Sequence, residues 1–208
     1  RNRKSIKVIF TKMNWKKILL ILFLTTFNFS YANSIEPDVF VQSTVNRASQ
    51  ILSENITKNE KINKLKSIAK ETVDIKGVGF YSLGSFRKNL ESVEKKKYSE
   101  LFEAYFLKSF SSRLAEYTNP EIDVIGKEFI NKNYTIVNSV LVGTSERPEV
   151  KIDWRIYTKD PENPLIRDLI IEGLSLARTQ KEEFASILNS NDGDINVLFV
   201  TLAEFSND

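Results

Sequence analysis

The segment DLIIEGLSLARTQKEEF, residues 168–184, contains the change of pattern that decides the fold of this chain. An apolar run from Leu169 to Ile171 is followed by Gly173, and apolar residues then recur at helical spacing as far as Phe184. A short apolar run that ends at a glycine is typical of a strand, and the later spacing is typical of an amphipathic helix. The segment therefore predicts a last strand from about Leu165 to Glu172, a turn, and a closing helix.

The same segment raises a chemical question, because Gly173-Leu174-Ser175-Leu176-Ala177 differs by one residue from G-x-S-x-G. That motif is the strand–turn–helix elbow that presents a nucleophilic serine in many hydrolases. Such a serine needs an adjacent base, and a lysine is the one candidate type that the composition leaves open. A secreted hydrolase that uses Ser175 is kept as an alternative. We expect instead that Ser175 binds backbone groups at the turn and that Thr179 and Glu182 form a capping box.

Histidine and cysteine are both absent from the 208 residues. A Ser-His-Asp triad, a Cys-His pair, a disulfide and a zinc site of the usual His/Cys kind are therefore excluded. We expect no catalytic residue, no metal and no cofactor, and a function other than catalysis.

The segment MNWKKILLILFLTTFNFSYA, residues 13–32, has the three parts of a secretory signal peptide. Two lysines precede an apolar run, and a small-x-small cleavage site follows it. The run is shorter than the roughly twenty residues of a membrane-spanning helix, which makes an uncleaved anchor the weaker alternative. We predict cleavage after Ala32, export to the periplasm, a true start at Met13, and upstream sequence in residues 1–12.

The net charge and the length of residues 33–208 limit the class of protein and the number of domains. The whole sequence has 30 Lys and Arg against 27 Asp and Glu, but residues 1–32 hold seven of the basic residues and none of the acidic ones. Residues 33–208 therefore carry a net charge of about −4, which gives no electrostatic basis for binding nucleic acid. Their length predicts a single domain, which we expect to be a monomer.

Residues 33–119 are predicted to be mainly helical. Helices are expected after Pro37 and from Asn59 to Lys70, because apolar residues recur there at three- and four-residue spacing. The longest periodic segment runs from Ser92 to Tyr117 without glycine or proline, and its aromatic residues share one face.

Residues 120–208 are predicted to form a sheet followed by a C-terminal helix. Apolar and polar residues alternate around Ile122, from Tyr134 to Val142 and from Val150 to Tyr157. Strict alternation of this kind indicates antiparallel strands with one buried face. With the strand that begins near Leu165, the chain is predicted to be α+β, with an N-terminal helical layer packed on a curved four-stranded antiparallel sheet.

Several short motifs occur in a fixed order along residues 35–205. They are Pro37-x-x-Phe40-Val41, Leu83-Gly84 with Phe86-Arg87, the spaced aromatics Phe102, Phe106 and Tyr117, Asp153-Trp154-Arg155, and Asp168-x-x-x-Glu172-Gly173-x-Ser175. This ordered set resembles the motifs of the MlaC / toluene-tolerance auxiliary family. Phe86 stands where the family usually has tryptophan.

The resemblance implies an NTF2/cystatin-like fold with an apolar cavity between helices and sheet. It also implies a soluble periplasmic lipid-transport protein that holds a phospholipid by its acyl chains as cargo. Members of the family carry lipid between an outer-membrane lipoprotein complex and an inner-membrane MCE-domain ABC transporter complex, and so support outer-membrane lipid asymmetry.

The periodicity selects the residues that we expect to line the cavity. They are Phe80, Leu83, Phe102, Phe106 and Phe110 from the helices, and Val140, Ile152, Trp154 and Ile170 from the strands. Arg87 is a candidate for the cavity mouth, for a partner surface, or for an ordinary solvated arginine. A further alternative is a secreted cystatin- or NTF2-like module that binds another apolar ligand or a protein.

Overall fold

The structure is a computed structural model that describes residues 34–145 and 147–207. The predicted signal peptide, the start at Met13 and the upstream residues 1–12 lie outside the described residues and stay predictions. No helix in the described part of the chain is long and apolar enough to cross a membrane.

The chain forms helices where periodicity and end signals predict them. Pro37 occupies the first turn of α2, and Thr57 with Glu60 forms a capping box at the start of α3. The helices are α2 (Pro37–Ser53), α3 (Lys58–Thr72), α4 (Ile75–Ser82), the short 3-10 helix η1 (Phe86–Lys88), α5 (Ser92–Leu114), α6 (Leu176–Asn189) and α7 (Ile195–Asn207). Three of them, α4, η1 and α7, were not predicted as separate helices.

The strands form one antiparallel sheet in the order β1-β2-β3-β4-β5. Their bounds are β1 (Ile122–Asn131), β2 (Tyr134–Leu141), β3 (Val150–Tyr157), β4 (Leu165–Ile171) and β5 (Leu174–Ser175). The α+β prediction is confirmed, and the two-residue β5 adds to the four predicted strands. β5 follows a tight turn in which Glu172 and Gly173 have φ values of 49° and 81°, in the left-handed region that favours glycine.

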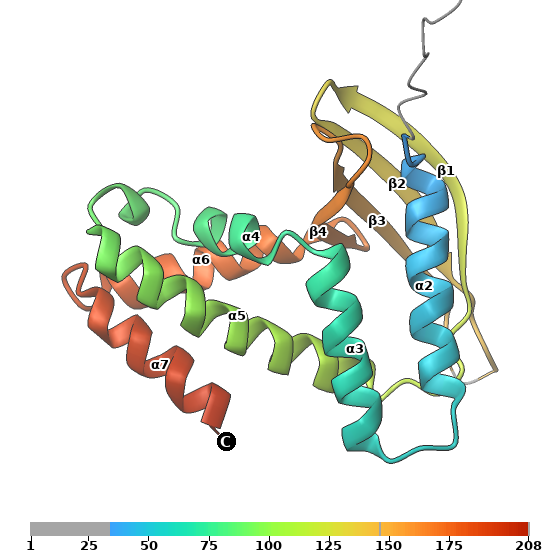
Figure 1. The fold of residues 1–208 in the computed structure, drawn as a ribbon, viewed down its shortest axis with the longest axis horizontal. Coiled ribbons are helices and arrows are strands. Elements are labelled where there is room, and N and C mark those ends of the chain that lie inside the picture. Colours follow the sequence, from blue (N-terminus) through green and yellow to red (C-terminus); the bar gives the residue numbers. More distant parts are fainter. Residues whose placement is uncertain (1–33, 146, 208) are drawn as a thin grey trace, which may run out of the picture. The chain divides into compact units, whose positions relative to one another are not determined.

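The buried side chains form two separate cores. One lies between α2 and the sheet and includes Val41, Val45, Val137, Trp154 and Ile156. The other lies among the helices from α3 onward and includes Tyr98, Phe102, Phe184, Leu188 and Leu198. Figure 1 shows this division, with α2 beside the sheet and α5 and α7 side by side away from it.

A short junction connects the helices to the sheet. Val73 packs against both cores and forms an isolated parallel bridge with Ile166 of β4. The next residue, Asp74, caps α4 through Gly77 and accepts a hydrogen bond of 2.7 Å from Nε of Arg167. The same guanidinium stacks 3.8 Å from the ring centre of Tyr157. This junction fixes the position of α4 relative to β4.

α2 also covers the outer edge of β1. The side-chain amide of Gln42 donates to the carbonyl of Ile122 at 3.2 Å and accepts from the N–H of Val124 at 3.0 Å. One glutamine therefore satisfies two backbone groups that an edge strand would otherwise leave open for another strand. Farther along β1, Lys127 binds Asp38 near the start of α2 at 2.8 Å.

We predict that Gly79→Ala destabilises the helical core. A Cβ at Gly79 would lie 2.7 Å from a ring carbon of Phe102, which is itself 2 % exposed and cannot move aside. Overpacking of this kind costs about 1–3 kcal/mol. The hydroxyl of buried Tyr98 also donates to the Gly79 carbonyl at 2.8 Å, so a shift of α4 would disturb that bond.

Urea unfolding measures the effect of Gly79→Ala, and Gly126→Ala is the matched control. A Cβ at Gly126 meets only the Asn138 side chain, at 3.9 Å, so this variant should unfold close to the parent. A Gly79→Ala protein as stable as the parent would show that α4 and α5 are not packed as described.

We predict that the Lys127–Asp38 pair stabilises the fold only above the acid range. The hydrogen bond from Lys127 lowers the pKa of Asp38 below its usual value of 3.8. A carboxyl with a lowered pKa contributes stability above its unfolded pKa and loses that contribution as the pH falls through its folded pKa. Because the pair is partly exposed, solvent screening limits its contribution to about 1 kcal/mol or less.

The test compares parent and Lys127→Ala by urea unfolding between about pH 6 and pH 2.5. The difference in unfolding free energy should be present at the upper end and vanish at the lower end. A difference that is constant across this range would assign the effect of Lys127 to packing rather than to its charge.

Candidate ligand-binding site

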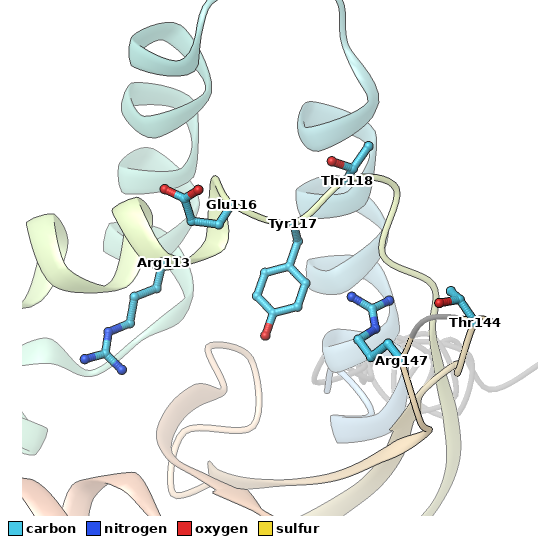
Figure 2. Close-up of a pocket in the computed structure, with 6 residues that line it drawn as sticks. All are labelled: Arg113, Glu116, Tyr117, Thr118, Thr144 and Arg147. Atoms are coloured by element: carbon cyan, nitrogen blue, oxygen red, sulfur yellow. The ribbon is translucent and has the colours of Figure 1, made fainter.

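The larger of the two described cavities lies between the end of α5 and the loop that connects β2 to β3. Its volume is about 760 Å³, within the range of roughly 300–1,000 Å³ that is typical of ligand pockets. The lining residues are Arg113, Glu116, Tyr117, Thr118, Thr144 and Arg147. Figure 2 shows Tyr117 reaching into this space from the α5 side and Arg147 from the loop.

The charges in this cavity are unbalanced. Glu116 forms an ion pair with Lys58 of α3, which compensates its charge. Among the described residues, neither Arg113 nor Arg147 has an acidic partner within ion-pair distance. Nε of Arg147 is buried and has no hydrogen-bond partner in the described part of the chain. The cavity is therefore cationic and includes a buried donor without an acceptor.

An aromatic stripe on α5 leads to this cavity. Phe102, Phe106, Phe110 and Arg113 follow one another at four-, four- and three-residue spacing, which places them along one side of the helix. The rings of Phe106 and Phe110 are stacked, with centres 5.5 Å apart. Phe102 is buried, whereas Phe106 and Phe110 are half-buried, so the stripe becomes more accessible toward Arg113.

A second, smaller cavity of about 380 Å³ lies where α4 and the start of α6 approach the sheet. Its arginines differ from those of the larger cavity because both have acidic partners. Arg167 binds Asp74, and Nη1 of Arg155 lies 3.5 Å from Asp168. The positive charges of both arginines in the smaller cavity are therefore compensated by carboxylates of the protein.

The five helical residues predicted to line an apolar cavity all lie in or against the helical core. Leu83 and Phe102 are buried within it, and Phe80, Phe106 and Phe110 are half-buried against it. Exposed Arg87 donates to the carbonyl of Phe80 at 3.2 Å and lines neither cavity.

The four strand residues predicted to line the cavity divide between the two faces of the sheet. Ile152 and Trp154 are buried toward α2. Val140 pairs with Lys151 and Ile170 with Asp153, which places both on the opposite face. None of the nine predicted residues is among those that line the two described cavities, so their contact with a ligand stays a prediction.

Sequence reasoning missed the polar residues of the larger cavity. Arg113, Tyr117 and Arg147 come from a helix end and from a loop, where periodicity selects no face. One available signal was the continuation of the Phe106–Phe110 stripe to a cation three residues later. Arg147 offered no comparable signal.

Ser175 is a structural residue in this fold. Its hydroxyl donates to the buried carboxylate of Asp168 at 2.6 Å and accepts from the N–H of Arg178 at 3.1 Å, which caps α6. The predicted capping box at Thr179 is therefore wrong, because the helix already starts at Leu176 once Ser175 is held by Asp168. Thr179 lies in the first turn and donates to the Ser175 carbonyl at 3.0 Å.

The charges near Ser175 also have partners. Asp168 accepts from the Ala177 N–H at 2.9 Å and lies beside Arg155, the partner suggested by the sequence. Glu172 accepts from the Lys151 N–H at 2.5 Å. The described residues contain no cluster of acidic side chains that could hold a metal ion.

The fold and the cavity define an α+β protein in which a helical part and a sheet, each with its own core, are joined beside a ligand-sized cationic cavity. The chain belongs to the MlaC family, because the family model described as MlaC protein matches residues 42–204. No curated protein matches the chain.

A solved structure has a similar fold. It is a phospholipid-binding protein from Ralstonia solanacearum, determined in complex with a phospholipid. The TM-score is 0.69 and the sequence identity 18%, over 83% of this chain and 98% of that chain.

We predict that Ser175→Ala weakens the fold without affecting any catalysis. Loss of a side-chain N-cap costs about 1 kcal/mol, and Asp168 would lose one of its hydrogen bonds. Thermal unfolding measures the loss, and Thr179→Ala should cost less because its hydroxyl bonds only to a carbonyl within the helix. A parent esterase activity that disappears selectively in Ser175→Ala would contradict this structural role.

Proposed function

We propose that this protein binds a phospholipid and carries it through the periplasm between the two membranes. The observation that supports this most directly is the aromatic stripe of α5, which ends at a cavity of about 760 Å³. Half-buried Phe106 and Phe110 provide apolar surface for acyl chains, and the cavity provides a polar end for a head group. The chain's membership of the MlaC family and its fold, shared with a phospholipid-binding protein, support the same conclusion.

A carrier of this kind is required by the energetics of lipid transfer. Two acyl chains contain roughly thirty methylenes, each of which costs about 0.8 kcal/mol to expose to water. Free lipid monomers are therefore negligible, and a carrier must cover the chains during transfer. This requirement favours a site with apolar side chains that are not fully packed against the protein itself.

The proposed function is binding and transport rather than catalysis. Ser175, the candidate nucleophile, has its hydroxyl held by Asp168 and by the backbone of α6. By analogy with the family, the partners would be an inner-membrane MCE-domain ABC transporter complex and an outer-membrane lipoprotein complex. The leader predicted from the sequence of residues 13–32 would place the protein there.

The test is extraction of the purified protein with organic solvent and identification of the lipids by mass spectrometry. We expect about one phospholipid per chain, or uptake to that level from phospholipid vesicles. Substitution of the two half-buried rings (Phe106→Ala and Phe110→Ala) should lower the amount of bound lipid. The control Val93→Ala, at an exposed position in the first turn of α5, should leave that amount unchanged.

A protein that neither contains phospholipid nor accepts it from vesicles would contradict the carrier function. Copurification of a different apolar molecule at the same stoichiometry would favour the cystatin- or NTF2-like binding module. Thermal unfolding of each variant shows whether a lower lipid content reflects loss of the site or loss of the fold.

A further inference from the structure

The larger cavity is lined by two arginines whose positive charges are not balanced by ion pairs among the described residues. Arg113 and Arg147 come from α5 and from the β2–β3 loop, and neither has an acidic partner among the described residues. The two arginines of the smaller cavity, Arg155 and Arg167, each have such a partner. The larger cavity is thus set apart by two arginines that form no ion pair with a carboxylate in residues 34–145 and 147–207.

The Arg147 side chain contacts Tyr117, and its Nε makes no hydrogen bond to a described residue. Its guanidinium lies over the Tyr117 ring, 5.5 Å from the ring centre. Its Nε is buried without a hydrogen-bond partner in the described part of the chain. A buried donor of this kind costs free energy unless an acceptor fills the site. A guanidinium that lies over Tyr117, with a donor that has no acceptor among the described residues, suits the charged oxygens of a phosphate better than it suits a neutral acceptor.

We propose that Arg113, Tyr117 and Arg147 bind the phosphate of a lipid head group and make the carrier selective for phospholipids of net negative charge. This inference rests on the proposed function. The phosphate accepts hydrogen bonds from the guanidinium groups, and the Tyr117 hydroxyl is a further donor at the same cavity. A zwitterionic head group has the same phosphate, but its ammonium group is repelled by the two arginines, and the one described carboxylate of the cavity, Glu116, is already paired with Lys58.

The experiment offers the lipid-free protein mixed vesicles of equal phosphatidylglycerol and phosphatidylethanolamine with matched acyl chains. Bound lipid is then identified by mass spectrometry. We expect phosphatidylglycerol to exceed phosphatidylethanolamine by about tenfold, the low end for a charge-assisted contact. The ratio should fall toward one as the salt concentration rises, because the contact lies at an open mouth.

Variants assign the selectivity to the two arginines. Arg113→Gln with Arg147→Gln should take up both lipids with a ratio near one. Arg47→Gln is the matched control, because it removes the same charge from a surface pair with Glu71 on the helices α2 and α3. It should keep the ratio of the parent. If the double variant does not fold, the parent's lipid ratio and its salt dependence still test the proposal.

Two further ligands identify what the arginines recognise. Diacylglycerol, which has the tails without the phosphate, should bind at least about tenfold more weakly than phosphatidylglycerol. Inorganic phosphate is added to the lipid-loaded protein, and chloride at the same ionic strength is the control. Phosphate should displace no more phosphatidylglycerol than chloride does. Displacement by phosphate alone would show a free-anion site and overturn the lipid assignment.

The outcomes separate this inference from the function on which it rests. Equal uptake of both phospholipids by the parent, or a selectivity that survives in the double variant, overturns the head-group site and leaves the carrier function intact. Failure to bind either phospholipid overturns both.

Discussion

The buried carboxylate of Asp168 is the interaction on which the connection between sheet and helices depends. Its side chain is 1% exposed, and a charge so deeply buried destabilises the fold unless its oxygens have partners. The Ser175 hydroxyl and the Ala177 N–H donate to it, and Arg155 lies 3.5 Å away. These contacts fix where β4 ends, where α6 begins and in which direction the helix leaves the sheet.

The placement of α6 in turn determines the helical core. Phe184 and Leu188 of α6 are buried against α5 residues, and Phe102 meets Phe184 edge-on with ring centres 6.2 Å apart. The second connection, Asp74 with Arg167, holds the start of α4 against β4. Both connections lie at β4, and within residues 34–145 and 147–207 no ion pair joins the C-terminal end of α5 to a strand. The larger cavity forms at that end, between Tyr117 and Arg147.

The fold could be predicted where a regular pattern extends over several residues. Apolar and polar residues alternate in Val150–Tyr157, and this pattern predicted strand β3. The spacing of the aromatic residues predicted helix α5. Both patterns are informative because burial of one face dictates the period. The start of α6 could not be predicted in the same way. Ser175 and Thr179 are both good N-cap residues, and only the distant Asp168, which pairs with Arg155 across the sheet, determines which of them caps the helix.

The candidate site was less predictable than the fold for a related reason. Periodicity separates the buried face of an element from its exposed face, but it does not separate a packed core from a ligand-facing wall. Leu83 and Phe106 have the same apolar character in sequence, yet Leu83 is 2% exposed and Phe106 is only half-buried. Leu83 follows the end of α4 and belongs to the buried helical core, whereas Phe106 packs against that core without being enclosed by it.

This difference in burial is what would let α5 serve both the stability of the fold and the proposed binding. Within the first half of α5, Tyr98 and Phe102 are closely packed, and burial raises the pKa of the Tyr98 hydroxyl far above its usual value. Toward its end, Phe106 and Phe110 stack on each other and therefore keep their geometry without full burial. A wall that is rigid before the ligand arrives loses less conformational entropy on binding. Buried Leu107 and Ser111 anchor the second half of α5 as well, so Phe106 and Phe110 can stay half-buried there without loosening the helix.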